Sequence, residues 1–146
     1  MNPFKIIKKS NKVNQIFCFP GNAGTKNISK NINLNLENFA EIKDYILENG
    51  IDLIIVGPEK PLVDGIVDYL EKFNIKVFGP NKIASQLEGS KMFTKKICEE
   101  FKIPTAKFQI FEKIDNAKNY LQKVNFPIVI KSDNLASGKG VYICKN

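Results

Sequence analysis

DLIIVGPEKPLVDGIVDYL, residues 52–70, is the stretch of sequence that decides the fold. Its first five residues are an unbroken apolar run, which is typical of a strand in a parallel sheet that is covered on both faces. Pro61 suits the first position of a helix. Leu62, Ile66 and Leu70 then recur every four residues, which predicts a helix with one apolar face. A buried strand that leads directly into such a helix predicts a right-handed βαβ unit.

The alternation of strand and helix continues on both sides of this stretch. Apolar runs predict further strands at 14–19, 76–78, 107–111 and 127–131. Helical periodicity predicts helices at 37–49, 82–88, 90–101 and 115–124, with Phe39, Ile42 and Ile46 on one face of the first. We expect Phe93, Ile97 and Phe101 on the inner face of the third of these helices. Single helices between strands indicate an α/β fold with an open, mostly parallel sheet, and Gly79-Pro80 indicates a seam between two domains.

The net charge does not by itself indicate a nucleic-acid-binding protein. The formal net charge is +7, but all 22 basic residues are lysines. Proteins that read nucleic-acid grooves rely on the planar fork of arginine. Because the lysines are also dispersed along the chain, we expect no specific nucleic-acid partner. A noncatalytic module that binds nucleotides or nucleic acids remains the alternative from a different class.

The cysteines and the apolar runs indicate a cytoplasmic protein without a metal site of its own. Cys18, Cys98 and Cys144 have no metal-ligand spacing, and the chain contains no His. Scattered thiols fit a reducing compartment. No run approaches the ~20 apolar residues of a membrane span, and the N-terminus lacks a signal-peptide pattern. We therefore expect no membrane partner.

PGNAGT, residues 20–25, follows the first predicted strand, at the edge where open α/β sheets bind ligands. Its glycines allow positive φ and leave backbone N–H groups uncovered, while its asparagine and threonine add short hydrogen-bonding side chains. This pattern suits a small anionic or hydroxylated ligand, and an ordinary turn is the alternative. The candidate binding residues are Pro20, Gly21, Asn22, Gly24 and Thr25.

GPE, residues 57–59, occupies the equivalent place after the next strand. Pro58 and Pro61 stiffen the backbone around Glu59, which holds its carboxylate at the ligand edge of the sheet. That carboxylate could accept hydrogen bonds from ribose hydroxyls or from an amine, and an exposed glutamate in a turn is the alternative. Gly57, Pro58 and Glu59 join the candidate substrate-binding set, whereas Asp64 is expected to complement the dipole at the start of the next helix.

PIVIKSDNLASGKGVYI, residues 127–143, predicts a hairpin with a glycine-rich loop. Lys131 ends a strand that the pattern predicts to be buried, so its ammonium group emerges at a defined point. The loop can donate backbone N–H groups to phosphates at low steric cost, although a plain hairpin would have the same pattern. Ser90-Lys91 opens a helix and could bring a second lysine to the same phosphates. The candidate phosphate-binding residues are Lys91, Lys131, Ser137, Gly138, Lys139 and Gly140.

Five segments, taken in order, resemble phosphoribosylamine–glycine ligase (glycinamide ribonucleotide synthetase), an ATP-grasp enzyme of purine biosynthesis. They are PGNAGT (20–25), DLIIVGPEKPLVDGIVDYL (52–70), FGPNKIASQLEGSKMFTK (78–95), IPTAKF (103–108) and PIVIKSDNLASGKGVYI (127–143). The first two segments and LEGSK are specific to this ligase among ATP-grasp enzymes, whereas the final hairpin is shared more widely. Another ATP-grasp ligase of purine metabolism is therefore the alternative among enzymes.

The resemblance implies an ATP-dependent carboxylate–amine ligase. ATP would phosphorylate the glycine carboxylate, and the amine of 5-phosphoribosylamine would attack the glycyl phosphate to give glycinamide ribonucleotide, ADP and phosphate. A Rossmann-like, pre-ATP-grasp domain over 1–88 would bind phosphoribosylamine through PGNAGT and Glu59. The first part of an ATP-grasp domain would follow over 89–146. There, Lys91 and Lys131 would contact the ATP phosphates, and the loop at 138–140 would close over them.

The resemblance is incomplete at both ends. In the family, a β-strand and a loop of the form GxGGREHA precede the helix at which this chain starts. The adenine pocket, the ligands of Mg²⁺ (or Mn²⁺) and most of the glycine site would follow Asn146. We therefore expect the chain to hold half of each site and to be inactive alone. Its expected partners are the small molecules glycine and 5-phosphoribosylamine and a C-terminal part of the same enzyme.

Overall fold

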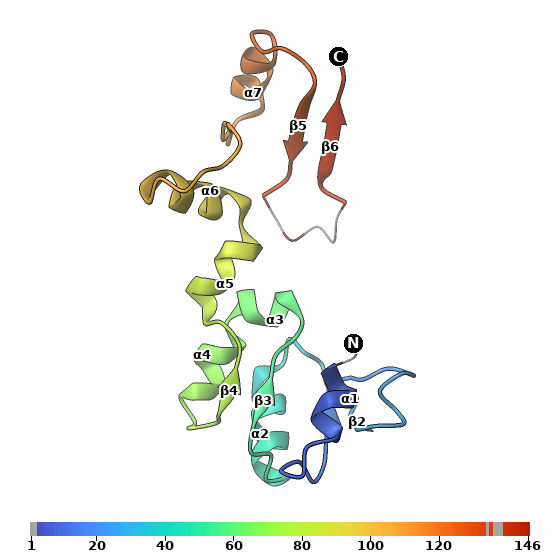
Figure 1. Ribbon diagram of the computed structural model, residues 1–146. Helices are drawn as coiled ribbons and strands as arrows, with labels where there is room; N and C mark the ends of the chain where they lie inside the picture. Colours follow the sequence, from blue (N-terminus) through green and yellow to red (C-terminus); the bar gives the residue numbers. More distant parts are fainter. Residues whose placement is uncertain (1–2, 134, 136–138) are drawn as a thin grey trace. The chain divides into compact units, whose positions relative to one another are not determined.

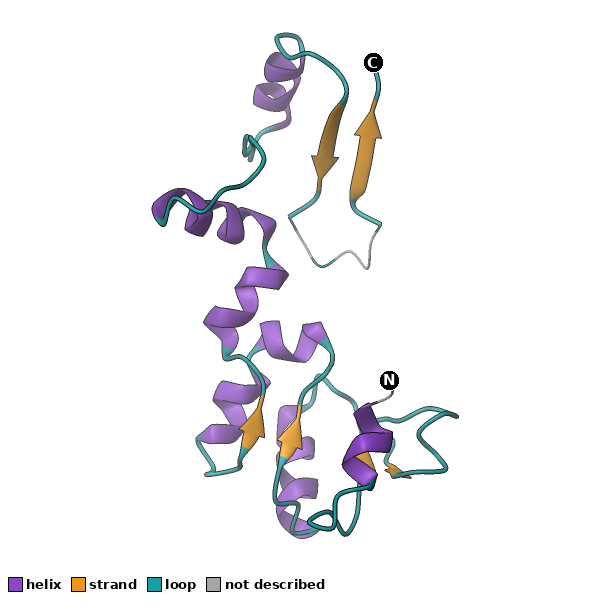
Figure 2. Ribbon diagram, in the orientation of Figure 1, coloured by secondary structure: helices purple, strands orange, loops and turns teal. Residues whose placement is uncertain are grey.

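The computed structural model describes residues 3–133, 135 and 139–146, with helices and strands as drawn in Figures 1 and 2. The chain divides into two compact units. The first comprises Met1–Val56 and Ile66–Gly79, and the second comprises Gly57–Gly65 and Pro80–Asn146. Residues 57–65 thus belong to the second unit, although the residues directly before and after them belong to the first.

The first unit consists of two parallel strand pairs and three helices. Its elements are α1 (Pro3–Lys8), β1 (Phe17–Cys18), β2 (Lys30–Asn31), α2 (Phe39–Glu48), β3 (Ile54–Ile55), α4 (Ile66–Glu71) and β4 (Val77–Phe78). In the first pair Phe17 lies opposite Lys30, and in the second Ile54 lies opposite Val77. β3 and β4 are joined through helices, whereas turns and loop residues join β1 to β2. Both pairs are parallel, which confirms the predicted α/β fold with parallel pairing.

The core of the first unit lies between the apolar faces of α2 and α4. Ile42 and Ile46 of α2 are each 1% exposed, and Leu70 of α4 is 0% exposed. Complete burial of each such side chain contributes about 1.5–3 kcal/mol. These residues are the ones that the helical periodicity selects, so the apolar faces of both helices are as expected. Around them lie the buried side chains of Cys18, Ile66, Val67 and Ile75.

The second unit contains four helices and a hairpin. Its elements are α3 (Glu59–Asp64), α5 (Lys82–Gly89), α6 (Lys91–Glu100), α7 (Ile114–Leu121), β5 (Ile128–Lys131) and β6 (Val141–Cys144). β5 and β6 pair antiparallel with Lys131 opposite Val141. The Ser132 N–H donates to the Gly140 carbonyl at 2.8 Å and closes the mouth of the predicted hairpin.

α3 packs closely against α5. A Cβ atom at Gly89 would lie 2.6 Å from Cγ2 of Val63, so only a glycine allows the two helices to approach this closely. Pro61, Leu62 and Ser85 are buried in the same contact. The close packing explains why the segment at 57–65 belongs to the second unit.

One predicted helix is two helices in the structure. The helix expected from Pro61 begins two residues earlier, at Glu59, and stops at Gly65, whose φ of 97° is left-handed. A left-handed glycine ends a helix because it turns the chain away from the helical path. Leu62 therefore packs in the second unit, while Ile66 and Leu70 pack in the first.

The apolar runs of the second unit are less buried than their pattern predicts. β5, expected to be buried, has Val129 51% and Ile130 42% exposed, and Phe101 of the expected inner helix face is 65% exposed. Residues 107–111, all described, form no strand. An apolar pattern leads to burial only where another layer covers it, and no described part of the chain covers these residues.

Candidate functional site

Gly21 gives the PGNAGT loop a shape that no other residue could adopt without strain. Its φ is 80°, in the left-handed region, and a Cβ atom there would lie 2.3 Å from Cγ of Asn31. Both the backbone conformation and the close approach of β2 therefore require glycine at this position. Gly24, by contrast, has no positive φ, and its nearest neighbour would be Oδ1 of Asn22 at 3.2 Å.

The PGNAGT loop uses most of its polar groups to hold its own shape. The Asn22 N–H donates to Oγ1 of Thr25 at 2.8 Å, and Oδ1 of Asn22 accepts from the N–H groups of Gly24 and Thr25 at 2.8 and 3.1 Å. Thr25 is 6% exposed. These three N–H groups, which the sequence suggested for a ligand, are thus already bonded. The exposed surface of the loop is that of Pro20, Asn22, Ala23 and Gly24.

Asn31 of β2 ties the loop to the neighbouring strand, a role that the sequence analysis missed. Its Nδ2 donates to the carbonyl of Asn22 at 2.9 Å. Its Oδ1 lies 2.9 Å from Oγ1 of Thr25 and 3.2 Å from Oγ of Ser29. The sequence does show an asparagine six residues after the glycine-rich loop. Its contact with the loop follows only from the parallel pairing of β1 and β2, which places Asn31 opposite Cys18.

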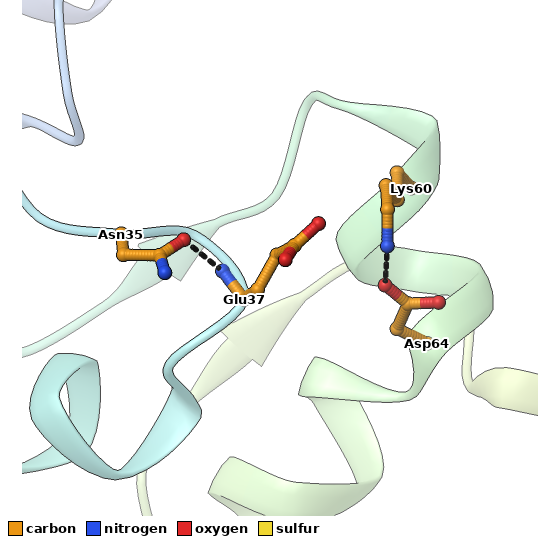
Figure 3. A network of polar contacts seen from close by, with 4 residues as sticks. All are labelled: Asn35, Glu37, Lys60 and Asp64. Atoms are coloured by element: carbon orange, nitrogen blue, oxygen red, sulfur yellow. Dashed lines mark hydrogen bonds and ion pairs between the residues drawn. The ribbon is translucent and has the colours of Figure 1, made fainter.

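Glu59 stands exposed as the first residue of α3, with Pro58 at the N-cap. Its carboxylate complements the helix dipole, the role expected of Asp64. That expectation for Asp64 was wrong, because α3 starts earlier than predicted and ends at Asp64. Asp64 instead accepts from Nζ of Lys60 at 2.6 Å, one helical turn away (Figure 3).

The two candidate substrate-binding segments belong to different units. PGNAGT lies in the first, and Gly57, Pro58 and Glu59 lie in the second. Figure 3 shows one polar contact from each unit. In the first, Oδ1 of Asn35 accepts from the N–H of Glu37 at 3.0 Å in the turn before α2. In the second, Lys60 and Asp64 form the ion pair of α3.

The start of α6 is held by a carboxylate from the hairpin. The Met92 N–H donates to Oδ1 of Asp133 at 2.6 Å, and the Ser90 hydroxyl donates to Oδ2 at 3.0 Å. Oγ of Ser90, the N-cap residue, also accepts from the N–H of Phe93 at 3.0 Å. Asp133 therefore acts as a second cap, and the sequence analysis did not identify it because 41 residues separate it from Met92.

This contact brings the two candidate lysines into one region of the second unit. Lys91 is the first residue of α6, between Ser90 and Met92. Lys131 ends β5, two residues before Asp133, and is exposed. Lys139 and Gly140 stand just before β6, with Lys139 exposed. Ser137 and Gly138, also expected to bind phosphate, lie outside the described residues.

An open cleft of about 460 Å³ lies beside this contact in the second unit. Its lining comes from α3, from the junction of α5 and α6, and from the hairpin. The lining residues are Lys60, Val63, Asp64, Gln86, Gly89, Ser90, Asp133 and Leu135. Neither candidate lysine is among these described lining residues, so the cleft adjoins the lysine pair and is distinct from it.

Among the residues that the structure describes, no group of three or more His, Cys, Asp or Glu side chains could hold a metal ion. No described helix is long and apolar enough to cross a membrane.

Two family descriptions match the chain in succession. Residues 4–88 match "Phosphoribosylglycinamide synthetase, N domain". Residues 89–146 match "Phosphoribosylglycinamide synthetase, ATP-grasp (A) domain". Together they account for nearly every residue.

Proteins similar to this chain are named phosphoribosylamine–glycine ligase. Phosphoribosylamine–glycine ligases of Caldanaerobacter subterraneus subsp. tengcongensis and Clostridium acetobutylicum are 44% and 46% identical over 140 residues, 96% of this chain. The chain spans about a third (34%) of the length of these relatives. The crystal structure of the Thermotoga maritima phosphoribosylamine–glycine ligase superposes with a TM-score of 0.71 at 28% identity, covering 98% of this chain and 32% of that one.

Proposed function

Because the chain belongs to the phosphoribosylglycinamide synthetase family, whose N domain matches residues 4–88, we propose that it forms part of an ATP-dependent phosphoribosylamine–glycine ligase. In this role residues 1–88 bind phosphoribosylamine, and residues 89–146 start the ATP-grasp domain. The whole enzyme joins glycine to 5-phosphoribosylamine in purine biosynthesis.

The proposed reaction has two steps. The glycine carboxylate attacks the γ-phosphorus of ATP, which gives glycyl phosphate and ADP. The amine of 5-phosphoribosylamine then attacks the carbonyl carbon, and the C–O bond to phosphate breaks, which gives glycinamide ribonucleotide and phosphate. The nucleophile of the first step is already anionic. Positioning and neutralisation of phosphate charge therefore carry most of the catalysis.

Cationic side chains of the second unit suit the charge of ATP. Lys131, at the end of β5, and Lys91, at the start of α6, supply ammonium groups on either side of the Asp133 contact. Lys139 and Gly140, just before β6, belong to the proposed phosphate-binding set. The N–H groups of Met92 and Phe93 are bonded to protein oxygens, so phosphate recognition falls to the lysines and the loop.

We propose, for each unit by itself, that PGNAGT in the first and Gly57, Pro58 and Glu59 in the second contribute contacts to phosphoribosylamine. The rigid hydrogen-bonded loop presents Asn22 and Gly24 to a hydroxylated ligand. Glu59, exposed at the start of α3, offers a carboxylate to ribose hydroxyls or to the amine. Preorganised groups of this kind bind small polar ligands at low entropic cost.

A divalent cation, Mg²⁺ or Mn²⁺, would neutralise the triphosphate and polarise the transferred phosphoryl group. The described residues of this chain offer no acidic cluster for it.

The observation that carries the proposal is the Asp133 contact, which gathers the lysine-bearing hairpin and the start of α6 within a chain of this family. A hybrid enzyme tests it. The present chain replaces the corresponding third of the Caldanaerobacter ligase, and ADP release is measured with glycine and 5-phosphoribosylamine. We expect release that depends on both substrates.

Two controls define the background: the Caldanaerobacter ligase without the segment that the chain replaces, and the present chain alone. Neither is expected to release ADP, because each contains only part of the length of the ligase. A hybrid that turns over ATP with bicarbonate or formate, but not with glycine plus 5-phosphoribosylamine, would refute the proposal and favour another ATP-grasp ligase of purine metabolism.

A further inference from the structure

Asp133 adds hydrogen bonds to the start of α6, although Ser90 already caps this helix. Ser90 already caps the helix locally through the N–H of Phe93. Asp133 adds two hydrogen bonds from another element, one of them 2.6 Å long. Hydrogen bonds that involve an ionised carboxylate are shorter and stronger than neutral ones. Ser90, Met92 and Asp133 are all partly buried, which limits competition from water.

The charge at the start of α6 explains why a carboxylate is needed there. A helix N-terminus carries roughly half a positive charge, and Lys91, the first helical residue, adds a full one. Two positive features so close together are unfavourable. Asp133 offsets them, so that a lysine can stand at this position without destabilising the helix.

The same carboxylate fixes the geometry of the hairpin. Asp133 follows Lys131 by two residues, and Lys131 is held in register opposite Val141. The Ser132 N–H, bonded to the carbonyl of Gly140, closes the ladder directly before Asp133. A side chain anchored two residues beyond the end of a strand leaves that end little freedom to move away from α6.

We propose that Asp133 is a positioning residue of the nucleotide site: it fastens the end of β5 to the start of α6 and so fixes Lys131 relative to Lys91. This inference rests on the proposed function and adds a residue to it. Asp133 does not touch the nucleotide. It keeps the end of α6 closed to phosphate and directs the phosphates to the two ammonium groups.

The test uses the hybrid ligase with four variants: Asp133→Ala, Asp133→Asn, Lys131→Ala and the double variant Asp133→Ala/Lys131→Ala. Asp133→Ala is expected to raise the KM for ATP about tenfold, because small misplacements of binding groups have effects of this order or larger. The KM for glycine should stay within about twofold. In the Lys131→Ala background the loss of Asp133 should change the KM for ATP by less than about twofold, because coupled residues are not additive.

Asp133→Asn separates positioning from folding. Its amide keeps one oxygen that can accept from Met92 but loses the charge, so we expect a folded enzyme with a smaller rise in the KM for ATP. Asp115→Ala is the matched control, because Asp115 lies in the first turn of α7, away from the hairpin contact. It should lower the melting temperature without changing the KM for ATP.

The outcomes distinguish the two proposals. A hybrid with the natural sequence that does not turn over ATP refutes the proposed function, and the role of Asp133 with it. An active hybrid in which Asp133→Ala and Asp133→Asn leave the KM for ATP unchanged refutes only the role of Asp133. Additive effects of Asp133→Ala and Lys131→Ala would also refute it, because Asp133 would then not act through Lys131.

Discussion

At the scale of single residues, a few positions carry most of the geometric constraint. Gly21 combines a left-handed backbone with a close approach to Asn31. Gly65, with φ of 97°, separates two helices that the periodicity had joined. Asp133 links parts of the chain 41 residues apart. The path of the chain depends on the missing Cβ atom at Gly21 and Gly65 and on the carboxylate at Asp133.

The requirement for glycine at position 21 can be measured. Gly21→Ala should lower the free energy of unfolding by about 2–5 kcal/mol, since left-handed strain and overpacking against Asn31 add together. Urea denaturation of the full chain gives the value. Gly50→Ala is the matched control, because Gly50 has φ of 57° but nothing within 4 Å of its Cβ position. It should cost only about 1–2 kcal/mol, from strain alone. Equal losses in the two variants would mean that the contact with Asn31 is unimportant.

The two hairpin lysines should differ in their effect on ATP. In the hybrid ligase, Lys131→Ala is expected to raise the KM for ATP about 10–100-fold, the size of a lost charge-assisted contact. Lys139→Ala should have a much smaller effect, because Lys139 lies outside the ladder that holds Lys131 opposite Val141. Steady-state kinetics at saturating glycine provides the comparison. Equal effects would contradict the assignment of Lys131 as the main phosphate contact on the hairpin.

At the scale of elements, helix termini and strand ends hold the candidate residues in place. α2 begins at Asn38, whose side chain accepts from the Glu41 N–H at 3.2 Å. α6 begins at Ser90 with Asp133 as a second cap, and α3 presents Glu59 in its first turn. Because capping and dipole effects act within one turn, these side chains are oriented by the ends of helices and not by the core.

The contact of Lys43 on α2 predicts a pH dependence of stability. Nζ of Lys43 lies 2.7 Å from Oδ1 of Asp44 and 5.0 Å from the ring centroid of Phe73. The hydrogen bond to Asp44, with a smaller contribution from its charge, raises the pKa of Lys43 above the usual 10.5. A raised pKa means that the stabilisation is complete below the unfolded pKa and is lost as pH rises through the folded one.

Lys43→Gln should therefore be less stable than the natural sequence at neutral pH. The difference in melting temperature should vanish as the pH rises above 10.5, because neither protein then carries a charge at this position. Lys72→Gln, at an exposed residue of the same unit, is the control for the loss of one lysine from the surface. A Lys43→Gln deficit that persists at high pH would point to packing against Phe73 as its cause.

At the scale of the whole molecule, the charge is distributed less evenly than the lysines alone suggest. Residues 1–36 contain six lysines and no acidic residue, and thus carry six of the net seven positive charges. In the first unit Lys8, Lys26 and Lys30 line a shallow hollow of about 250 Å³. Such a surface attracts polyanions without reading sequence, since ammonium groups are not bidentate.

Any binding of this chain to DNA should accordingly be weak and steeply dependent on salt. We expect Kd values of about 10⁻⁴–10⁻⁶ M at physiological salt, without sequence preference. Replacing Lys8, Lys26 and Lys30 by Gln should reduce the slope of log K against log[salt] by up to about three. The control replaces Lys72, Lys107 and Lys123 by Gln, which gives the same net charge. Tight, sequence-selective binding in fluorescence anisotropy would instead support a nucleic-acid-binding module.

The sequence by itself determined most of the alternation of strands and helices, the apolar faces of α2 and α4, and the family, although residues 107–111 form no strand. These features depend on residues that are close together in the chain, so that periodicity and short motifs report them directly. Ile42, Ile46, Ile66 and Leu70 are buried as their spacing predicts. PGNAGT and the lysine-bearing hairpin likewise lie at the ends of strands.

Only the tertiary structure decided the features that depend on contacts between distant residues. The break at Gly65 depends on the packing of α3 against α5, where Gly89 meets Val63. The caps formed by Asp133, 41 and 43 residues from their partners, have no local pattern. The exposure of β5 depends on which other elements cover it. The apolar sequence of the strand does not show whether such a cover is present. Local spacing fixes which face of an element is apolar, whereas long-range packing fixes what that face meets.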